Sequence, residues 1–292
     1  MTTFRSLTSL IEQNQLISPW RFQYLSSNNP FISYCRVESI WKTQNHHGLA
    51  IQPLMRSLRR IHHKALVFSD SDHSLKQKDI LFLKKLGAQK IFAANTSSGF
   101  SGFVETIPLG VADNSMHSPL YPYLNADIFL QADASSNFPT KFDGSIYLNV
   151  TTANAPKVRM PLVDELRDHP RAKILKPAFT LSGRMDFLRN IRENCLIPCP
   201  SGNGRDTHRL WETLYMGGTP VMIEDTFNKR LLDGLPVLFV KTWHDLWDQD
   251  LMEQLWYETT TRTYSFEKLY FSFWSDKVYR ARHKKFEKFR LN

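Results

Sequence analysis

The residues best suited to bind a charged ligand lie in one stretch, Cys195–Ile223. Its pattern predicts a strand, a glycine-bearing loop, a helix that ends at two glycines, and a second strand. Gly202 and Gly204 let the loop backbone turn sharply and approach a ligand closely. The loop leads into the amino end of the helix, where unbonded N–H groups and the helix dipole favour a phosphate group.

Four polar side chains share one side of this predicted helix, because they are spaced three or four residues apart. They are Arg205, His208, Arg209 and Glu212. Arginine is suited to bidentate contacts with phosphate, and a carboxylate one turn further on can bind the vicinal hydroxyls of a ribose. The pattern therefore indicates a nucleoside diphosphate site. A solvated helix with a glycine-rich entry is the alternative that the residues alone leave open.

The string CPSGNGRDTHRLWETLYMGGTPV resembles the nucleotide-sugar motif of exostosin-like glycosyltransferases, which have the two-domain GT-B fold. The matching positions are Pro200, Gly202, Asn203, Gly204, Asp206, Thr207, His208, Arg209, Trp211, Glu212, Gly217, Pro220 and Val221. Many members carry an arginine before the first glycine of the loop, where this chain has Ser201. We expect Arg205 to supply that charge instead.

The resemblance implies an inverting hexosyl- or pentosyltransferase that moves a sugar from a nucleotide-sugar to a glycan, a polysaccharide or a lipid-linked glycan. It implies a nucleotide-sugar donor, with a UDP-sugar favoured and the base left open, and neither a tightly bound cofactor nor a catalytic metal. Arg209 would contact the diphosphate, Glu212 would contact the ribose, and His208 would line the site. The implied donor-binding residues are Gly202, Asn203, Gly204, Arg205, Asp206, Thr207, His208, Arg209 and Glu212.

An inverting transfer needs a base that takes the proton of the acceptor hydroxyl. Ligands of open α/β sheets bind at the carboxyl ends of the strands, so polar residues that follow the predicted strand Lys64–Ser69 are candidates. Asp72 is the expected base, because related proteins often have an acidic residue near this point. Asp70, His73 and Asn95 are expected on the acceptor side. Asp70 and Asp72 equally suit the cap of the helix that follows.

Short apolar runs alternate with amphipathic stretches along the chain, which is typical of α/β folds with parallel sheets. The first half is predicted to have strands at Pro30–Val37, Lys64–Ser69, Gln89–Ala94 and Phe103–Val111, and helices at Gly48–Ile61 and Leu75–Leu86. An irregular linker is expected from Ala112 to Lys141. The second half is predicted to have strands at 145–150, 195–199, 220–223 and 236–240, and helices at 161–168, 182–193, 207–216, 243–257 and 266–288.

With the resemblance, this alternation predicts a GT-B fold of two Rossmann-like domains whose parallel sheets face a central cleft. Residues 1–141 would form the acceptor-side domain, and residues 142–275 would form the nucleotide-sugar-binding domain. The terminal helix, 276–292, would cross back to the first domain. Basic and aromatic residues interleave in this helix, which also suits peripheral contact with the inner face of a membrane. The two roles are compatible.

The composition limits the partners and the compartment. Among 292 residues, 37 Lys and Arg against 28 Asp and Glu give a net charge of +9, which favours an anionic partner. Three cysteines do not suggest a disulfide framework, and Cys195 and Cys199 are expected to be buried structural residues rather than metal ligands. No apolar run suits a signal peptide or a membrane span, so a cytoplasmic protein is expected.

Two other functions remain open at this point. The first is a catalytically inactive glycosyltransferase-like scaffold or carbohydrate-binding subunit, which would keep the fold and lack the reaction. The second is a basic nucleic-acid-binding protein, although the sequence has no RNP-type aromatic motif, zinc-finger spacing or helix-turn-helix signature.

Overall fold

The structure is a computed structural model that describes residues 7, 10–11, 13, 15–27, 32–34, 65–69, 74–96, 102–112 and 126–283. Contacts within the chain divide it into two compact units. Unit 1 comprises Met1–Ile17 and Gly110–Tyr270, and unit 2 comprises Ser18–Leu109 and Phe271–Asn292. Both are mixed α/β with parallel sheets, which confirms the predicted fold class at that level.

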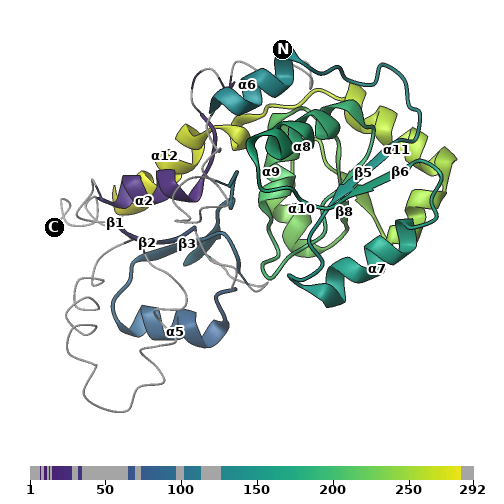
Figure 1. Ribbon diagram of the computed structural model, residues 1–292. Helices are drawn as coiled ribbons and strands as arrows, with labels where there is room; N and C mark the ends of the chain where they lie inside the picture. The colour runs from purple at the N-terminus through teal and green to yellow at the C-terminus, as the bar shows by residue number, and fades with distance from the viewer. Residues whose placement is uncertain are drawn as a thin grey trace. The chain divides into compact units, whose positions relative to one another are not determined.

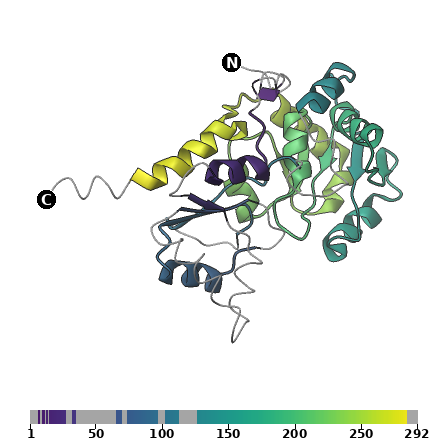
Figure 2. The same cartoon turned by 60° about the vertical axis from the view of Figure 1, so that its left-hand side comes forward.

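Unit 2 contains a four-stranded parallel sheet in the order β1-β2-β3-β4. The strands are β1 (Ile32–Tyr34), β2 (Ala65–Phe68), β3 (Lys90–Ala93) and β4 (Val104–Thr106). Helix α5 (Gln77–Lys85) covers one face of the sheet, and α2 (Pro19–Ser27) and α12 (Phe271–His283) cover the other (Figures 1 and 2). The two central strands are buried throughout or nearly so, as expected for parallel strands with helices on both faces.

Helix α12 is anchored to the sheet of unit 2 by charge and by aromatic packing. Lys277 Nζ lies 3.1 Å from one carboxylate oxygen of Glu105 on β4, and Lys90 Nζ lies 3.2 Å from the other. Burial raises the pKa of Glu105, but the two lysines outweigh it, and the pKa lies below its usual value. The Phe271 ring packs edge-on against Phe22 of α2, with 5.2 Å between ring centres.

Unit 1 contains the parallel pair β5 (Ile146–Asn149) and β6 (Ala172–Leu175), and the parallel strands β7 (Ile197–Pro198), β8 (Pro220–Ile223) and β9 (Leu238–Val240). A parallel bridge between Ile146 and Leu196 joins the two groups. The five strands therefore run in the order β6-β5-β7-β8-β9 with all their carboxyl ends at one edge. Leu148, Leu196 and Val221 are fully buried in the core beneath this edge.

Helices surround the sheet of unit 1. They are α6 (Ala126–Ala134), α7 (Pro156–Leu166), α8 (Leu181–Glu193), α9 (His208–Tyr215), α10 (Thr226–Leu232) and α11 (Gln249–Thr261), with 3-10 turns η2 (Trp243–Trp247) and η3 (Glu267–Leu269). Helices α8 and α9 pack against each other, and α6 packs on α8. In the described residues no helix combines the length and the apolar character needed to cross a lipid bilayer.

Several predicted boundaries differ from the structure. The linker expected over 112–141 contains α6, which packs on α8 and in which Phe129 and Ala132 are buried. The helix expected at 161–168 begins earlier, at Pro156, because proline also fits the first turn of a helix. The strand expected at 103–111 ends at Thr106, two residues before Pro108, which lacks the N–H that a ladder needs.

The helix expected at 243–257 is two elements, because the Asp248 side chain accepts from Leu251 N and begins α11 there. The helix expected at 266–288 is η3 followed by α12, which is described as far as His283. The helix predicted at Gly48–Ile61 lies outside the described residues.

Candidate functional site

The candidate site lies at the carboxyl edge of the unit 1 sheet, where ligands of parallel α/β sheets bind. β5 ends at Asn149 and β7 ends at Pro198, and a loop over residues 199–207 then leads into α9. The structure thus confirms the strand, loop, helix and strand predicted for Cys195–Ile223.

The loop is held in a tight fold by its own backbone and by an arginine from α7. Gly202 N donates to Gly204 O at 3.0 Å, and Ser201 Oγ donates to Arg205 O at 3.2 Å. Arg159 donates from Nε to Ser201 O at 3.2 Å, and from Nη1 to Thr151 O at 3.0 Å. A Cβ at Gly202 would lie 2.7 Å from Arg159 Nη2, so a larger residue there would displace this guanidinium.

Asp206 ties the end of the loop to α9. The indole Nε1 of Trp211 lies 2.8 and 2.9 Å from the two carboxylate oxygens of Asp206, and Thr207 N donates to Oδ1 at 2.8 Å. All three residues are buried. The Asp206 carboxylate is therefore engaged within the protein, and its evident role is to fix the start of α9. The Thr207 hydroxyl at the same helix end is buried without a hydrogen-bond partner.

Arg209 lies in the first turn of α9, close to Phe187 of α8. Its guanidinium carbon lies 5.9 Å from the centre of the Phe187 ring, and its Nε is buried without a partner. Burial lowers the pKa of Arg209, and the neighbouring Arg184 lowers it further, while Cys199, Glu212 and Tyr147 oppose this.

Two acidic neighbours of Arg209 stay neutral and do not balance its charge. Burial raises the pKa of the Cys199 thiol to about 12 and that of the Tyr147 hydroxyl to about 12. Of the groups that raise the pKa of Arg209, Glu212 is therefore the one that carries a negative charge near neutral pH.

Glu212 forms a buried ion pair with Arg184 of α8. Arg184 Nη2 donates to Glu212 Oε1 at 2.7 Å, and the exposed fractions of the two side chains are 15% and 4%. Ala112 N donates to the same oxygen at 3.4 Å. Burial raises the pKa of Glu212, but Arg184, followed by His208 and Arg209, outweighs it, and the pKa lies below its usual value. Glu212 is therefore a carboxylate that bridges α9 and α8.

Unsatisfied polar atoms gather at this one place. Within the described residues, three buried side-chain nitrogen or oxygen atoms have no hydrogen-bond partner: Arg184 Nε, Thr207 Oγ1 and Arg209 Nε. Buried donors without partners are costly, so such a cluster indicates a ligand that accepts hydrogen bonds. With two guanidiniums and one carboxylate nearby, the cluster also carries an excess of positive charge.

The other two basic residues of the motif are engaged by other groups. The Arg205 guanidinium pairs with Asp225 at 3.0 Å and stacks over Phe227, with 4.8 Å from its central carbon to the ring centre. The His208 ring donates from Nδ1 to Gly110 O at 2.8 Å. The extra charge that we expected from Arg205 is therefore already balanced, while Arg159 supplies a guanidinium beside Gly202.

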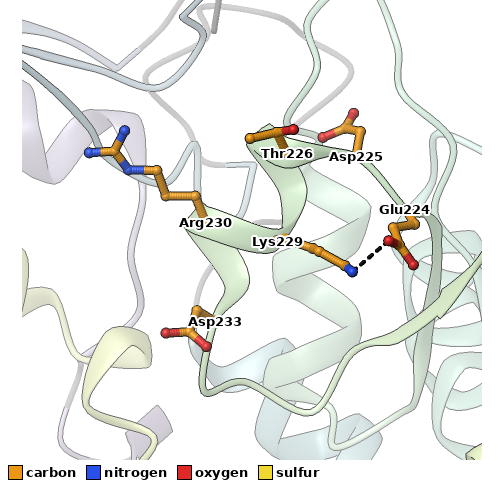
Figure 3. A pocket seen from close by; sticks show the side chains of 6 residues that line it. All are labelled: Glu224, Asp225, Thr226, Lys229, Arg230 and Asp233. Carbon is orange, nitrogen blue, oxygen red and sulfur yellow. Dashed lines mark hydrogen bonds and ion pairs between the residues drawn. The ribbon is translucent and has the colours of Figure 1, made fainter. Parts of the chain in front are cut away.

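Asp225 also borders a shallow hollow of about 630 Å³ beside α10. Figure 3 shows Lys229 and Glu224 pointing toward one another, with 2.5 Å between Nζ and Oε1, whereas Arg230 points away from them. The lining residues are Glu224, Asp225, Thr226, Lys229, Arg230 and Asp233. Acidic and basic groups are mixed there, so the hollow does not favour an anion over a cation.

The candidate acceptor residues fall into two groups. Asp70, Asp72 and His73 lie outside the described residues, so the expected base stays a prediction. Asn95 follows β3 in unit 2 and is buried, and its carbonyl accepts from Leu75 N at 3.1 Å. In unit 1, Cys195 and Cys199 are free and buried. No cluster of three or more potential metal ligands occurs in the described ranges.

Sequence reasoning missed Arg159 and Arg184. Both lie in helices that carry several basic residues, and neither spacing nor flanking residues distinguish them from surface arginines. Only the tertiary fold brings Arg159 to the loop and Arg184 to α9. Comparison of the chain with models of known protein families and with curated proteins found no match.

Proposed function

We propose that the protein is an inverting glycosyltransferase that binds a nucleotide-sugar donor at the loop 199–207 and the start of α9. The observation that carries this proposal is the cluster of buried, unpartnered donors on Arg184, Thr207 and Arg209. A diphosphate offers several acceptor oxygens and negative charge at the same point, which is what the cluster lacks.

The local chemistry supports a donor that leaves as a phosphate. Bond cleavage at the anomeric carbon leaves negative charge on the departing diphosphate, and fixed guanidiniums in a site of low water content stabilise such charge well. Arg209 meets this requirement, because its Nε is buried and has no hydrogen-bond partner among the described residues. The helix dipole of α9 acts in the same direction.

The rest of the proposal comes from the sequence resemblance to exostosin-like glycosyltransferases. It includes the GT-B arrangement, Asp72 as the base that deprotonates the acceptor hydroxyl, a UDP-sugar as donor, and a glycan or polysaccharide as acceptor. Unit 1 is then the donor-binding part, and unit 2 is the acceptor-binding part.

A thermal-shift screen against UDP, GDP, CDP, ADP and CMP, with their common sugar conjugates, tests the proposal. A ligand that binds the folded state alone raises its stability by about 2.7 kcal/mol at 100 times Kd. We expect a clear shift with one nucleoside diphosphate and its sugar conjugate, lost in Arg209→Met and kept in Arg230→Met. Arg230 is an exposed arginine of α10 and serves as the matched control.

Transfer itself is tested with the nucleotide-sugar that this screen identifies. Release of the free nucleoside diphosphate in the presence of glycan acceptors supports glycosyltransferase activity. Binding of the donor without release, over a broad acceptor panel, favours the inactive scaffold instead. If no nucleotide binds, the proposed function is wrong.

A further inference from the structure

Arg184 pairs with Glu212 and still has a hydrogen-bond donor without a partner. It lies in the first turn of α8, where one Nη donates to Glu212 while Nε is buried without a partner. Its guanidinium carbon lies 5.1 Å from the centre of the Phe187 ring and 5.7 Å from that of Phe129. Part of the side chain remains open to solvent. These contacts hold the guanidinium in place and leave donors for another group.

Arg184 and Arg209 approach the same aromatic ring. Their guanidinium carbons lie 5.1 and 5.9 Å from the centre of Phe187, and each guanidinium has a buried Nε that lacks a partner. The two like charges interact, since Arg184 lowers the pKa of Arg209. One carboxylate, Glu212, serves both. A second anion between the two guanidiniums would relieve the repulsion and use the idle donors.

The position of Glu212 bears on what it can do. Its side chain is almost fully buried, and Oε1 accepts from both Arg184 and the backbone N–H of Ala112. A carboxylate that contacts a ribose must present its oxygens to the ligand. Here the oxygen with identified contacts is turned toward α8 and residue 112, and the geometry is that of a group that orients an arginine.

We propose that Arg184 binds the diphosphate of the donor together with Arg209, and that Glu212 is a positioning residue that holds Arg184 in place. This inference rests on the proposed function and deepens it, because it names a second cation for the leaving group. It replaces the direct ribose contact that the resemblance implies for Glu212.

Inorganic pyrophosphate separates the two roles, because it has neither ribose nor base. If Glu212 positions Arg184, its loss weakens the binding of pyrophosphate and UDP alike. If Glu212 contacts the ribose, its loss weakens the binding of UDP and leaves that of pyrophosphate unchanged. Comparison of UDP with 2′-deoxy-UDP and 3′-deoxy-UDP then reports on the ribose contact directly.

The experiment is calorimetric titration of pyrophosphate and UDP into the full chain. The variants are Arg184→Gln, Glu212→Gln and the double variant. We expect Arg184→Gln to weaken pyrophosphate binding by about tenfold or more, because a charge-assisted contact is lost. Glu212→Gln should weaken it less. The double variant should bind as weakly as Arg184→Gln alone, since Glu212 acts through Arg184.

Two further variants protect the test from a change in folding or in overall charge. Arg189→Gln removes one positive charge from the same helix, at a side chain that pairs with Asp186 at the surface, and should bind pyrophosphate like the wild type. Arg184→Lys keeps the charge and should recover part of the binding lost in Arg184→Gln. If Arg184 had only a structural role, Arg184→Lys would not recover pyrophosphate binding selectively.

The outcomes separate this inference from the proposed function. If Glu212→Gln binds pyrophosphate like the wild type but loses UDP, the inference is overturned and the nucleotide site stands. It is also overturned if the wild type binds UDP and not pyrophosphate, or if Arg184→Gln binds pyrophosphate normally. If the wild type binds neither pyrophosphate nor any nucleoside diphosphate, both the inference and the proposed function fail.

Discussion

Two arginine–carboxylate pairs flank the loop 199–207, and they differ in burial rather than in geometry. Arg184–Glu212 and Arg205–Asp225 have N···O distances of 2.7 and 3.0 Å. In both, the arginine also lies over a phenylalanine ring. The exposed fractions are 15% and 4% in the first pair, but 35% and 37% in the second.

The difference teaches that burial decides what such a pair is able to do. The more exposed pair remains in contact with water, and pairs of this kind contribute little to stability. The buried pair has lost water and has not replaced all of its hydrogen bonds, and a second guanidinium stands beside it. Removal of one member of a buried pair is therefore costly, and an incoming anion gains more there than at the surface.

The largest expected effect is on stability, in Glu212→Ala. This change leaves Arg184 and Arg209 without the carboxylate that serves both, so the free energy of unfolding should fall by about 3–5 kcal/mol. Urea unfolding monitored by circular dichroism measures it. The double variant Glu212→Ala/Arg184→Met should be more stable than the single variant, because the unpaired charge is gone. A loss below about 1 kcal/mol in Glu212→Ala would show that the buried pair contributes no more to stability than the exposed pair.

The next effect is on nucleotide binding, in Arg209→Met. Loss of the Arg209 guanidinium should weaken binding of the nucleoside diphosphate by about a hundredfold, which corresponds to about 2.7 kcal/mol. Without ligand, the variant should be as stable as the wild type or more so, because it no longer buries a charge with an unpartnered Nε. Titration calorimetry measures the affinity, and thermal unfolding measures the stability without ligand. A strong loss of stability without ligand would contradict this account.

A pH series sharpens the comparison further. The folded-state pKa of Glu212 lies below the usual value of 4.5, so its contribution to stability is fully present above that value. As the pH falls through the folded-state pKa, Glu212 becomes protonated and this contribution is lost. We expect the acid dependence of the free energy of unfolding to be weaker in Glu212→Gln than in the wild type. Equal acid dependence would show that the Arg184 pair does not stabilise the charged carboxylate.

The smallest effect is expected in Arg205→Gln. Its pair with Asp225 is partly solvated, so the free energy of unfolding should change by about 1 kcal/mol or less. The change should shrink further in high salt, which screens exposed charges. Nucleotide affinity should change less than in Arg184→Gln. If Arg205→Gln instead abolished binding, the charge of the loop would come from Arg205 after all, as the sequence alone suggests.

The sequence predicts the strand, loop and helix of the site well, because the signals for these elements are local. Glycines mark the loop, spacing marks the polar side of α9, and apolar runs mark β7 and β8. Local signals say nothing of Arg184, since its contact with Glu212 spans 28 positions and depends on how α8 packs on α9. They mislead at Arg205, whose partner Asp225 is the N-cap residue of α10.

The same limit applies to the fold. The alternation of apolar and amphipathic stretches predicts the parallel sheets, because both faces of their strands must be apolar. It misses α6, since the prolines and polar residues around that helix suggest an irregular linker, whereas packing on α8 stabilises it. It also merges η2 with α11, because both are apolar on one side and only the Asp248 cap divides them.

The place of α12 in unit 2 has a consequence for the order in which the protein is made. The segments Ser18–Leu109 and Phe271–Asn292 belong to one unit, so about 160 residues are synthesised between them. At translation rates of about 5–20 residues per second, the sheet β1–β4 waits roughly 10–30 seconds for the helix that covers its second face together with α2. During that time unit 1 can already fold. The first sheet to leave the ribosome is therefore the last to be finished, and until α12 is made α2 alone covers its second face.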